Sequence, residues 1–176
     1  VSIRRFFRET LTVERLVGFG AMTEDTAVAL HALVASKLNV LIAGGTGSGK
    51  TSMLNALSSF IPEGERVVVI EDSRELQLQR DHVCMLEARP ADPKGRGEVT
   101  IRDLFRATLR LRPDRIVVGE IRGGEALDLI QAMTSGHGGC LATLHATYPR
   151  DTVSRLETMA MMSDIEMPLH ALRIQL

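Results

Sequence analysis

A glycine-rich segment of eight residues constrains the fold of this chain more than any other part of the sequence. Residues 44–51 read GGTGSGKT and match the pattern G-x4-G-K-[ST]. The apolar run before them, residues 39–43 (NVLIA), predicts a short strand covered on both faces, and residues 50–59 predict a helix. Glycines in such a loop let backbone N–H groups converge on phosphate oxygens, and the start of the helix adds partial positive charge. The segment therefore predicts a site for a nucleoside triphosphate.

The residues of this segment have separate expected tasks. Lys50 should reach the β- and γ-phosphates, and the hydroxyl of Thr51 should ligate Mg²⁺. A plain glycine-rich turn would not need lysine and threonine at the first helical turn, so we favour the phosphate site. The expected nucleotide-binding residues are Gly44, Gly45, Thr46, Gly47, Ser48, Gly49, Lys50, Thr51 and Ser52.

Predicted strands and helices alternate along the remaining chain. Strands are predicted at residues 66–71, 83–86, 115–119 and 140–144, and helices at 23–38, 100–112, 125–133, 151–162 and 168–176. A polar loop rich in proline and glycine is expected at residues 90–97 (PADPKGRG). With 176 residues, 44% of them hydrophobic, the chain is long enough for one sizeable domain. The alternation indicates an α/β fold with a mainly parallel sheet flanked by helices.

Charge and composition exclude several classes of protein. A formal net charge of −1 gives no positive field for nucleic acid, and an aromatic content of 3% leaves few platforms for base stacking, so direct nucleic-acid binding is not expected. No apolar run approaches the ~18 residues that a membrane span needs. Cys84 and Cys140 have no CxxC spacing and are expected to be reduced, buried thiols. The chain starts at Val1 without a secretory signal and ends in a helix-like stretch, so we expect a piece of a longer protein.

Two predicted strands end in acidic residues. Glu71 and Asp72 end the run VVVIED, and Glu120 ends the run IVVGE. In a parallel sheet, such carboxylates lie on the side of the phosphate loop, within reach of Mg²⁺ and the attacking water. We expect Glu71 to polarise that water, Glu120 to hold Mg²⁺ through a water molecule, and Asp72 to hold its own turn. Asp114 competes for the acidic role, but it precedes its strand and should lie at the far end.

Two histidines flank the last predicted strand, in the segment GHGGCLATLHA. His145 follows the strand, whereas His137 lies between glycines and is expected to position a loop or to reach a neighbouring subunit. A metal site formed by His137, Cys140 and His145 is an alternative. Spacings of two and four residues across a strand would splay these side chains apart, which disfavours it.

Together these segments resemble the secretion-ATPase superfamily, the hexameric ATPases of type II and type IV secretion and of type IV pili. The matching motifs are the Walker A segment, the aspartate box IEDSREL, the Walker B segment GEIR and the histidine box GHGGCLATLHA. Further stretches, such as SIRRF and GEVTIRDLFRATLRLRPDRIVVGEIRGGEALDLIQAM, are most similar to the tight-adherence (Flp) pilus branch, with the conjugative-transfer branch close behind. The resemblance covers nearly all of the chain.

The resemblance implies a RecA-like, Mg²⁺-dependent ATPase domain in which hydrolysis of ATP drives a machine. Residues 1–20 would be the tail of an interdomain linker and the start of the ATPase domain, and residues 21–176 a C-terminal ATPase domain truncated at its own C-terminus. The family resemblance implies a homo-oligomer, a hexamer in the full-length protein, that acts on a platform protein at the cytoplasmic face of the bacterial inner membrane. It also implies that His145 senses the γ-phosphate and that Arg4, in the linker, approaches the phosphates.

Other arginines and other functions remain open at this point. Arg110 and Arg122 flank the Walker B strand and are weaker candidates for a phosphate-contacting arginine. The cargo is either pilin or secreted protein, or the substrate of a conjugative type IV system. A module that binds nucleotide without hydrolysing it is a third possibility, but binding alone needs neither Glu71 nor Glu120. No LSGGQ-like transporter signature precedes the Walker B segment. A small-molecule kinase would need an arginine-bearing lid, and the loop at residues 90–97 carries Arg96 but is short, which disfavours that function.

Overall fold

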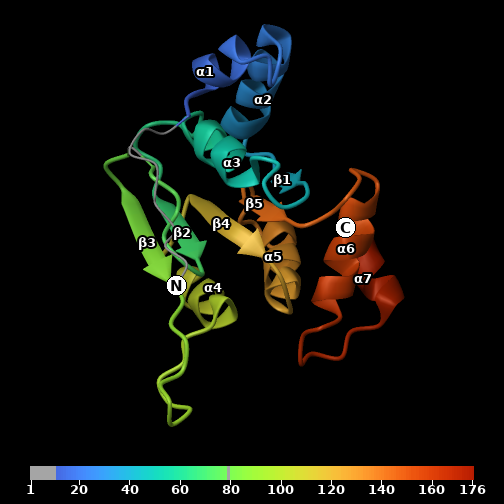
Figure 1. The fold of residues 1–176 in the computed structure, drawn as a ribbon. Coiled ribbons are helices and arrows are strands. Elements are labelled where there is room, and N and C mark those ends of the chain that lie inside the picture. The colour runs from blue at the N-terminus through green and yellow to red at the C-terminus, as the bar shows by residue number, and fades with distance from the viewer. Residues whose placement is uncertain (1–10, 79) are drawn as a thin grey trace.

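The computed structural model describes residues 11–78 and 80–176, and its centre is a five-stranded sheet (Figure 1). The strand order is β1-β5-β4-β2-β3, and all four neighbouring pairs are parallel. The strands are β1 (Val40–Ala43), β2 (Val67–Glu71), β3 (Val83–Glu87), β4 (Arg115–Ile121) and β5 (Leu141–Leu144). The α/β fold class predicted from the alternation of elements is confirmed.

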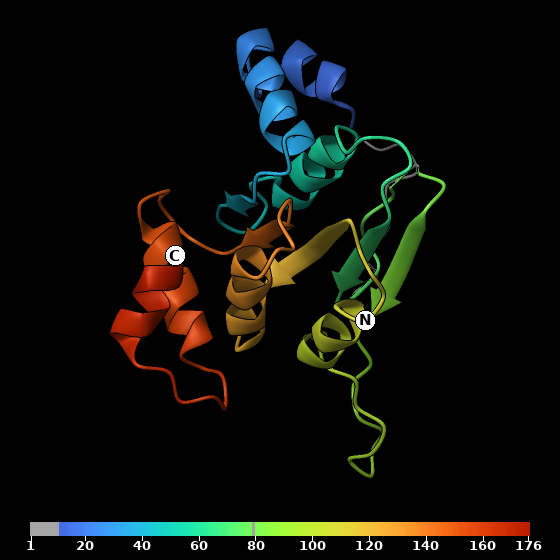
Figure 2. The same cartoon turned by 180° about the vertical axis from the view of Figure 1, so that it is seen from behind.

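Helices cover both faces of the sheet, so the molecule has three layers (Figures 1 and 2). The helices are α1 (Val13–Gly18), α2 (Glu24–Ala35), α3 (Lys50–Ser58), α4 (Ile101–Thr108), α5 (Glu125–Thr134), α6 (Asp151–Ala160) and α7 (Leu169–Gln175). Helices α2 and α3 pack on one face, α4 and α5 pack on the other, and α6 and α7 pack against α5. Residues of α1 join a third apolar cluster with Met22 and Ala56.

The central strands feed alternate side chains into the two layers, as a sheet buried on both faces requires. Val67 and Val69 of β2 pack with α2 and α3, whereas Ile70 packs with α4 and α5. In β4, Val117 faces the first layer, and its neighbours Ile116 and Val118 face the second. The continuous apolar runs of the sequence therefore supply two cores at once.

The element boundaries depart from the sequence predictions at a few places. Helix α4 ends at Thr108 rather than at residue 112. Backbone hydrogen bonds between residues three apart replace the helical pattern after Thr108, and Arg112, with a φ of 50°, turns the chain away. Helix α6 likewise ends at Ala160, and α1 was not predicted. Strand β1 is half-buried and, among the strands of the described residues, lies at one edge of the sheet, next to β5.

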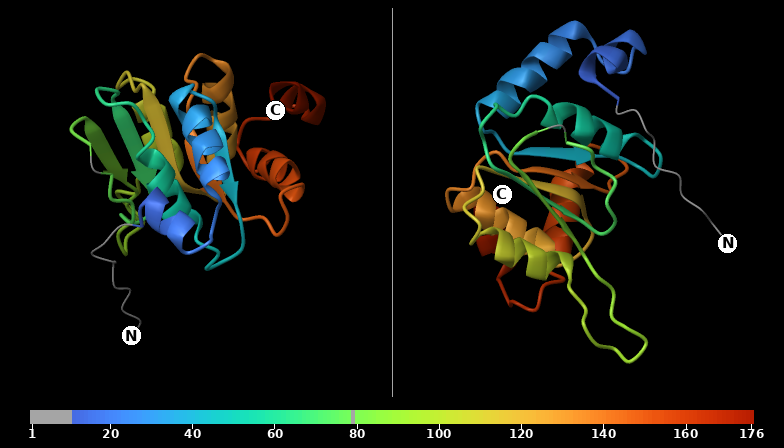
Figure 3. Two further views of the ribbon diagram at one scale, coloured as in Figure 1. Left: turned by 90° about the horizontal axis from the view of Figure 1, so that it is seen from above. Right: turned by 90° about the vertical axis from the view of Figure 1, so that its left-hand side faces the viewer.

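The predicted loop at residues 90–97 projects away from the body of the molecule (Figure 3). An antiparallel bridge between Arg89 and Val99 closes its base. At its tip, Asp92 accepts hydrogen bonds from the backbone N–H groups of Lys94 and Arg96. Within the two described ranges, no helix combines the length and the apolar character that crossing a membrane requires.

Candidate active site

A cavity of about 690 Å³ lies where the phosphate loop meets the carboxyl ends of the strands. Its walls come from the loop after β1, the ends of β2 and β4, and the residue after β5. The lining residues are Thr46, Gly47, Lys50, Thr51, Glu71, Asp72, Ser73, Glu75, Gly119, Glu120, Arg122 and His145. An open α/β sheet binds its ligands at this edge, so the cavity is the candidate active site.

The phosphate loop has the backbone that its glycines allow. Gly47 and Gly49 have φ values of 72° and 90°, in the left-handed region, and Gly49 is the N-cap residue of α3. The Nζ atom of Lys50 donates to the backbone oxygen of Gly45 at 2.9 Å, so the lysine lies folded over its own loop. Of the nine predicted nucleotide-binding residues, Thr46, Gly47, Lys50 and Thr51 line the cavity, and the others (Gly44, Gly45, Ser48, Gly49 and Ser52) belong to the same loop and helical turn.

Glu71, at the end of β2, is a buried carboxylate with only 5% of its surface exposed. Its Oε1 atom accepts hydrogen bonds from the backbone N–H groups of Glu75 and Leu76, at 3.1 and 3.0 Å. Burial raises the pKa of Glu71 above its ordinary value, and the two backbone hydrogen bonds partly oppose that rise. The carboxyl group is therefore held in a fixed orientation at the wall of the cavity.

Gly119 makes room for Glu71. A Cβ atom added at Gly119 would lie 2.9 Å from Cγ of Glu71, closer than real Cβ atoms come to a neighbour. The backbone oxygen of Gly119 accepts a hydrogen bond of 2.6 Å from the hydroxyl of Thr143 in β5. This glycine thus lets the ends of β2, β4 and β5 approach closely.

Glu120 enters the cavity next to an irregularity in β4. Between Val118 and Ile121 the pairing with β5 shifts by one extra residue, a bulge of the kind that re-aims side chains. Oε1 of Glu120 lies 3.9 Å from Nζ of Lys50, and Oε2 accepts from the guanidinium of Arg122. Glu71 and Glu120, 49 positions apart in the sequence, therefore line one cavity, as predicted.

Arg122 and Asp72 form a contact that sequence reasoning missed. Nη1 of Arg122 donates to Oδ2 of Asp72 at 2.9 Å, so Asp72 holds the end of another strand rather than its own turn. The hydrogen bond to Glu120 is the main cause that raises the pKa of Arg122. Arg122 follows Glu120 by two residues, so both side chains lie on the same side of an extended segment, and the sequence could have predicted this pair. Asp72 lies fifty positions from Arg122, and no feature of the sequence indicated their contact.

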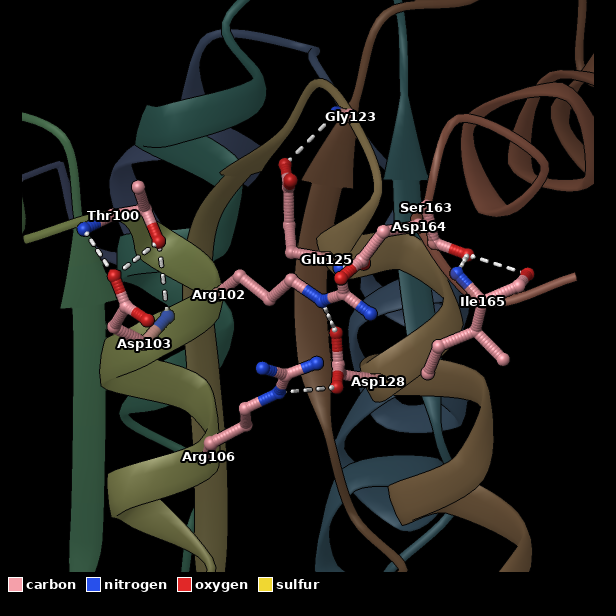
Figure 4. Close-up of polar contacts among 10 residues, drawn as sticks. All are labelled: Thr100, Arg102, Asp103, Arg106, Gly123, Glu125, Asp128, Ser163, Asp164 and Ile165. Atoms are coloured by element: carbon pink, nitrogen blue, oxygen red, sulfur yellow. Dashed lines mark hydrogen bonds and ion pairs between the residues drawn. The ribbon is translucent and has the colours of Figure 1, made fainter.

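A turn beneath Arg122 is fixed by the first residue of α5. Oε1 of Glu125 accepts from the backbone N–H groups of Arg122 and Gly123, at 2.7 and 2.9 Å. Figure 4 shows the contact with Gly123. One helical turn further on, buried Asp128 accepts from Arg102 and Arg106 of α4, which ties the two helices together.

The histidines have different surroundings. Nε2 of His145 forms a hydrogen bond of 3.0 Å with the hydroxyl of Thr46, which places the ring against the phosphate loop. His137 does not line the cavity, and its backbone oxygen accepts from Sγ of Cys140. Burial raises the pKa of Cys140 to about 12, so this thiol is protonated at neutral pH. Among residues 11–78 and 80–176, no three His, Cys, Asp or Glu side chains are grouped so that they could hold a metal ion.

Three further candidates lie elsewhere. Arg4 falls outside the described residues. Arg110 is exposed in the turn after α4 and does not line the cavity. Asp114 lies at the opposite end of β4, where its carboxylate accepts from the backbone N–H of Arg66.

The oxygen-rich cavity fits a magnesium ion bound with a nucleotide. The hydroxyl of Thr51 and the carboxylate of Glu120 line it together, and Mg²⁺ prefers one or two such protein oxygens beside phosphate oxygens and water. The described residues thus include both members of the predicted ligand set.

Comparisons with known proteins identify the family of the chain. The family model described as "Type II/IV secretion system protein" matches residues 1–175. The type IV secretion system protein PtlH of Bordetella pertussis is 47% identical over 124 residues, covering 69% of this chain and 36% of PtlH. The conjugal transfer protein TrbB of Rhizobium radiobacter is 35% identical over 161 residues, covering 90% of this chain and 48% of TrbB. The chain thus spans about half or less of the length of these relatives.

Solved structures share the fold. The VirB11 ATPase of the Brucella suis type IV secretion system matches with a TM-score of 0.77 and 29% identity, over 98% of this chain and 56% of that one. The pilus retraction motor PilT, with bound ADP, matches in fold with a TM-score of 0.70 and 22% identity, over 98% of this chain and 46% of that one. The chain therefore belongs to the type II/IV secretion system protein family and has the RecA-like fold of that family's ATPases.

Proposed function

We propose that this chain is the ATP-hydrolysing motor domain of a secretion or pilus-assembly machine, in which hydrolysis drives pilin assembly or substrate export. The observation that carries the proposal is the convergence of Lys50, Glu71 and Glu120 on one cavity beside the phosphate loop. Nucleotide binding alone needs the loop and its lysine. Hydrolysis needs, in addition, a carboxylate that can activate water, and the buried carboxylate of Glu71 meets this need.

Each lining residue has a task in this proposal. The loop N–H groups and Lys50 bind the phosphates, and Glu71 orients a water molecule and accepts its proton as the water attacks the γ-phosphorus. The products are ADP and inorganic phosphate. A carboxylate whose pKa is raised by burial is a stronger base than an exposed one, which suits this role. Mg²⁺, when bound by Thr51 and Glu120, would neutralise charge on the phosphate oxygens.

His145 is proposed to report the γ-phosphate to the phosphate loop. Its hydrogen bond to Thr46 supports this role, since a ligand that displaces the ring from Thr46 would alter the loop at the same time. Arg4 is proposed to complete the site from the linker.

The wider arrangement follows the family. We propose that residues 1–20 are the end of a linker, that residues 21–176 belong to a C-terminal ATPase domain, and that the full-length protein forms a hexamer. Its partner would be an inner-membrane platform protein, reached from the cytoplasmic face.

A conjugative type IV secretion ATPase is the second candidate. The similarity to the conjugal transfer protein TrbB over 90% of this chain favours it. The chemistry at the cavity would be the same in both cases, and only the cargo would differ.

Substitution of the phosphate-loop lysine tests the proposed function. Lys50→Ala removes the charge that holds the β- and γ-phosphates, so turnover in the complete protein should fall at least about 100-fold. Lys94→Ala, on the projecting loop, removes the same charge away from the cavity and should leave turnover unchanged. ATP turnover of Lys50→Ala equal to that of the unmodified protein would remove the assignment.

A further inference from the structure

Arg122 stands between the active-site cavity and a second one. The second cavity, of about 550 Å³, shares Asp72, Ser73, Glu120 and Arg122 with the first. Its other walls come from the base of the projecting loop and the first residues of α4 and α5. Glu120 and Arg122 therefore line both cavities, and Glu120 has open space on the side of the second one.

The two oxygens of Glu120 have different neighbours. Oε2 accepts a hydrogen bond from Nε of Arg122 and forms an ion pair with Nη2, whereas Oε1 faces Nζ of Lys50 at 3.9 Å. With Oε2 held, the carboxylate cannot rotate into the second cavity. Oε1 therefore stays directed at the place where the terminal phosphates would lie.

Arg122 is itself fixed from two further directions. Its Nη1 donates to Asp72, and its backbone N–H donates to Glu125. Figure 4 shows Glu125 reaching to the adjacent Gly123, above the Arg102–Asp128 contact that joins α4 to α5. The guanidinium is thus anchored although 66% of its side chain is exposed.

Stability alone does not explain this arrangement. Ion pairs of exposed side chains contribute little to folding stability, so the contacts of Arg122 add little to it. Hydrogen-bond partners that orient a metal-ligating carboxylate have much larger effects on activity, about 10- to 100-fold. The geometry therefore favours a role in orienting Glu120.

We propose that Arg122 is a positioning residue that holds the carboxylate of Glu120 in its active orientation and is itself held by Asp72. This inference rests on the proposed function, because it assigns Glu120 to the metal. It differs from the expectation that an arginine near the Walker B strand contacts phosphate directly.

The test compares Arg122→Lys with Arg122→Ala in the complete protein. Lysine keeps the positive charge but cannot bond Glu120 and Asp72 with a planar fork. Arg122→Lys should lower kcat about 10- to 100-fold while the affinity for Mg·ATP stays within about threefold. Arg122→Ala should lower kcat at least as much. Arg155→Lys, at an exposed position of α6 outside both cavities, is the matched control and should change neither value.

A double variant separates positioning from direct contact. If Arg122 acts only through Glu120, then Glu120→Gln with Arg122→Lys should turn over as slowly as Glu120→Gln alone. An additional loss of about tenfold or more in the double variant, or unchanged kcat in Arg122→Lys, would overturn the proposal. Failure of the proposed function would give a different result, because Glu120→Gln by itself would then hydrolyse ATP at the normal rate.

Discussion

Gly119 and Glu71 show how a single missing side chain shapes the cavity. The buried carboxylate of Glu71 passes so close to the backbone of β4 that a Cβ atom at position 119 would collide with its Cγ atom. The glycine is therefore required by a neighbour on another strand, and not by its own backbone conformation. Glycines are usually explained by a turn or a positive φ, and neither reason identifies a glycine of this kind from the sequence.

The substitution Gly119→Ala tests this packing. The methyl group must displace Glu71, so ATP hydrolysis should fall strongly, and overpacking should lower the free energy of unfolding by about 1–3 kcal/mol. Gly18→Ala is the matched control, because a Cβ atom there meets nothing within 4 Å. Chemical denaturation and ATP turnover measure the two effects. A Gly119→Ala protein with normal turnover would show that Glu71 is not needed where the structure places it.

Sequence reasoning predicted the cavity residues whose positions follow from local pattern. Lys50 and Thr51 follow from the loop pattern, and Glu71 and Glu120 from their places at the ends of apolar runs. The bond between Arg122 and Asp72 was not predicted, because it depends on β2 and β4 being neighbours. The order of the strands is set by packing over the whole sheet, so it cannot be predicted from the sequence of one strand.

At the scale of elements, capping residues explain why the starts of two helices, α2 and α4, were predicted correctly. Thr23 and Thr100 both accept a backbone N–H bond at the start of a helix, and Thr100 forms a reciprocal capping box with Asp103. Helix ends were less predictable. The apolar periodicity of α4 continues to residue 112, but the chain turns earlier. The turn brings Asp114, just before β4, into hydrogen bonds with the backbone of Arg66, just before β2.

The capping box of α4 gives a stability prediction. Thr100→Ala removes the acceptor for the backbone N–H of Asp103 and should lower the free energy of unfolding by about 1 kcal/mol. Thr158→Ala, at an exposed position inside α6, should not lower it, because alanine is the better helix former. Equal effects of the two substitutions in urea denaturation would contradict the role of the cap.

The same box adds a pH dependence. Hydrogen bonds from Thr100 lower the pKa of Asp103, so its contribution to stability is present above the unfolded-state pKa and is lost as the pH falls through the folded-state value. The stability difference between the unmodified protein and Thr100→Ala should therefore shrink in acid.

At the scale of the whole molecule, the candidate active site depends on the order of the strands in the sheet. Four segments far apart in sequence supply the cavity, and they meet because β1, β5, β4 and β2 lie side by side with their carboxyl ends at one edge. The α/β class was predictable from alternating patterns. The edge position of β1 was not, since an apolar run reports burial of faces and says nothing about the number of neighbouring strands.

We propose that Glu71 and Glu120 act in the hydrolysis of the bound triphosphate rather than in its binding. The most direct measurement is the Mg·ATP dissociation constant and the single-turnover hydrolysis rate of Glu71→Gln and Glu120→Gln in the complete protein, with exposed Glu63→Gln as the control. We predict affinities within a few-fold of the unmodified protein and hydrolysis slowed at least about 100-fold in both variants, with no change in the control. Normal hydrolysis in either variant, or loss of binding in place of hydrolysis, would contradict the claim.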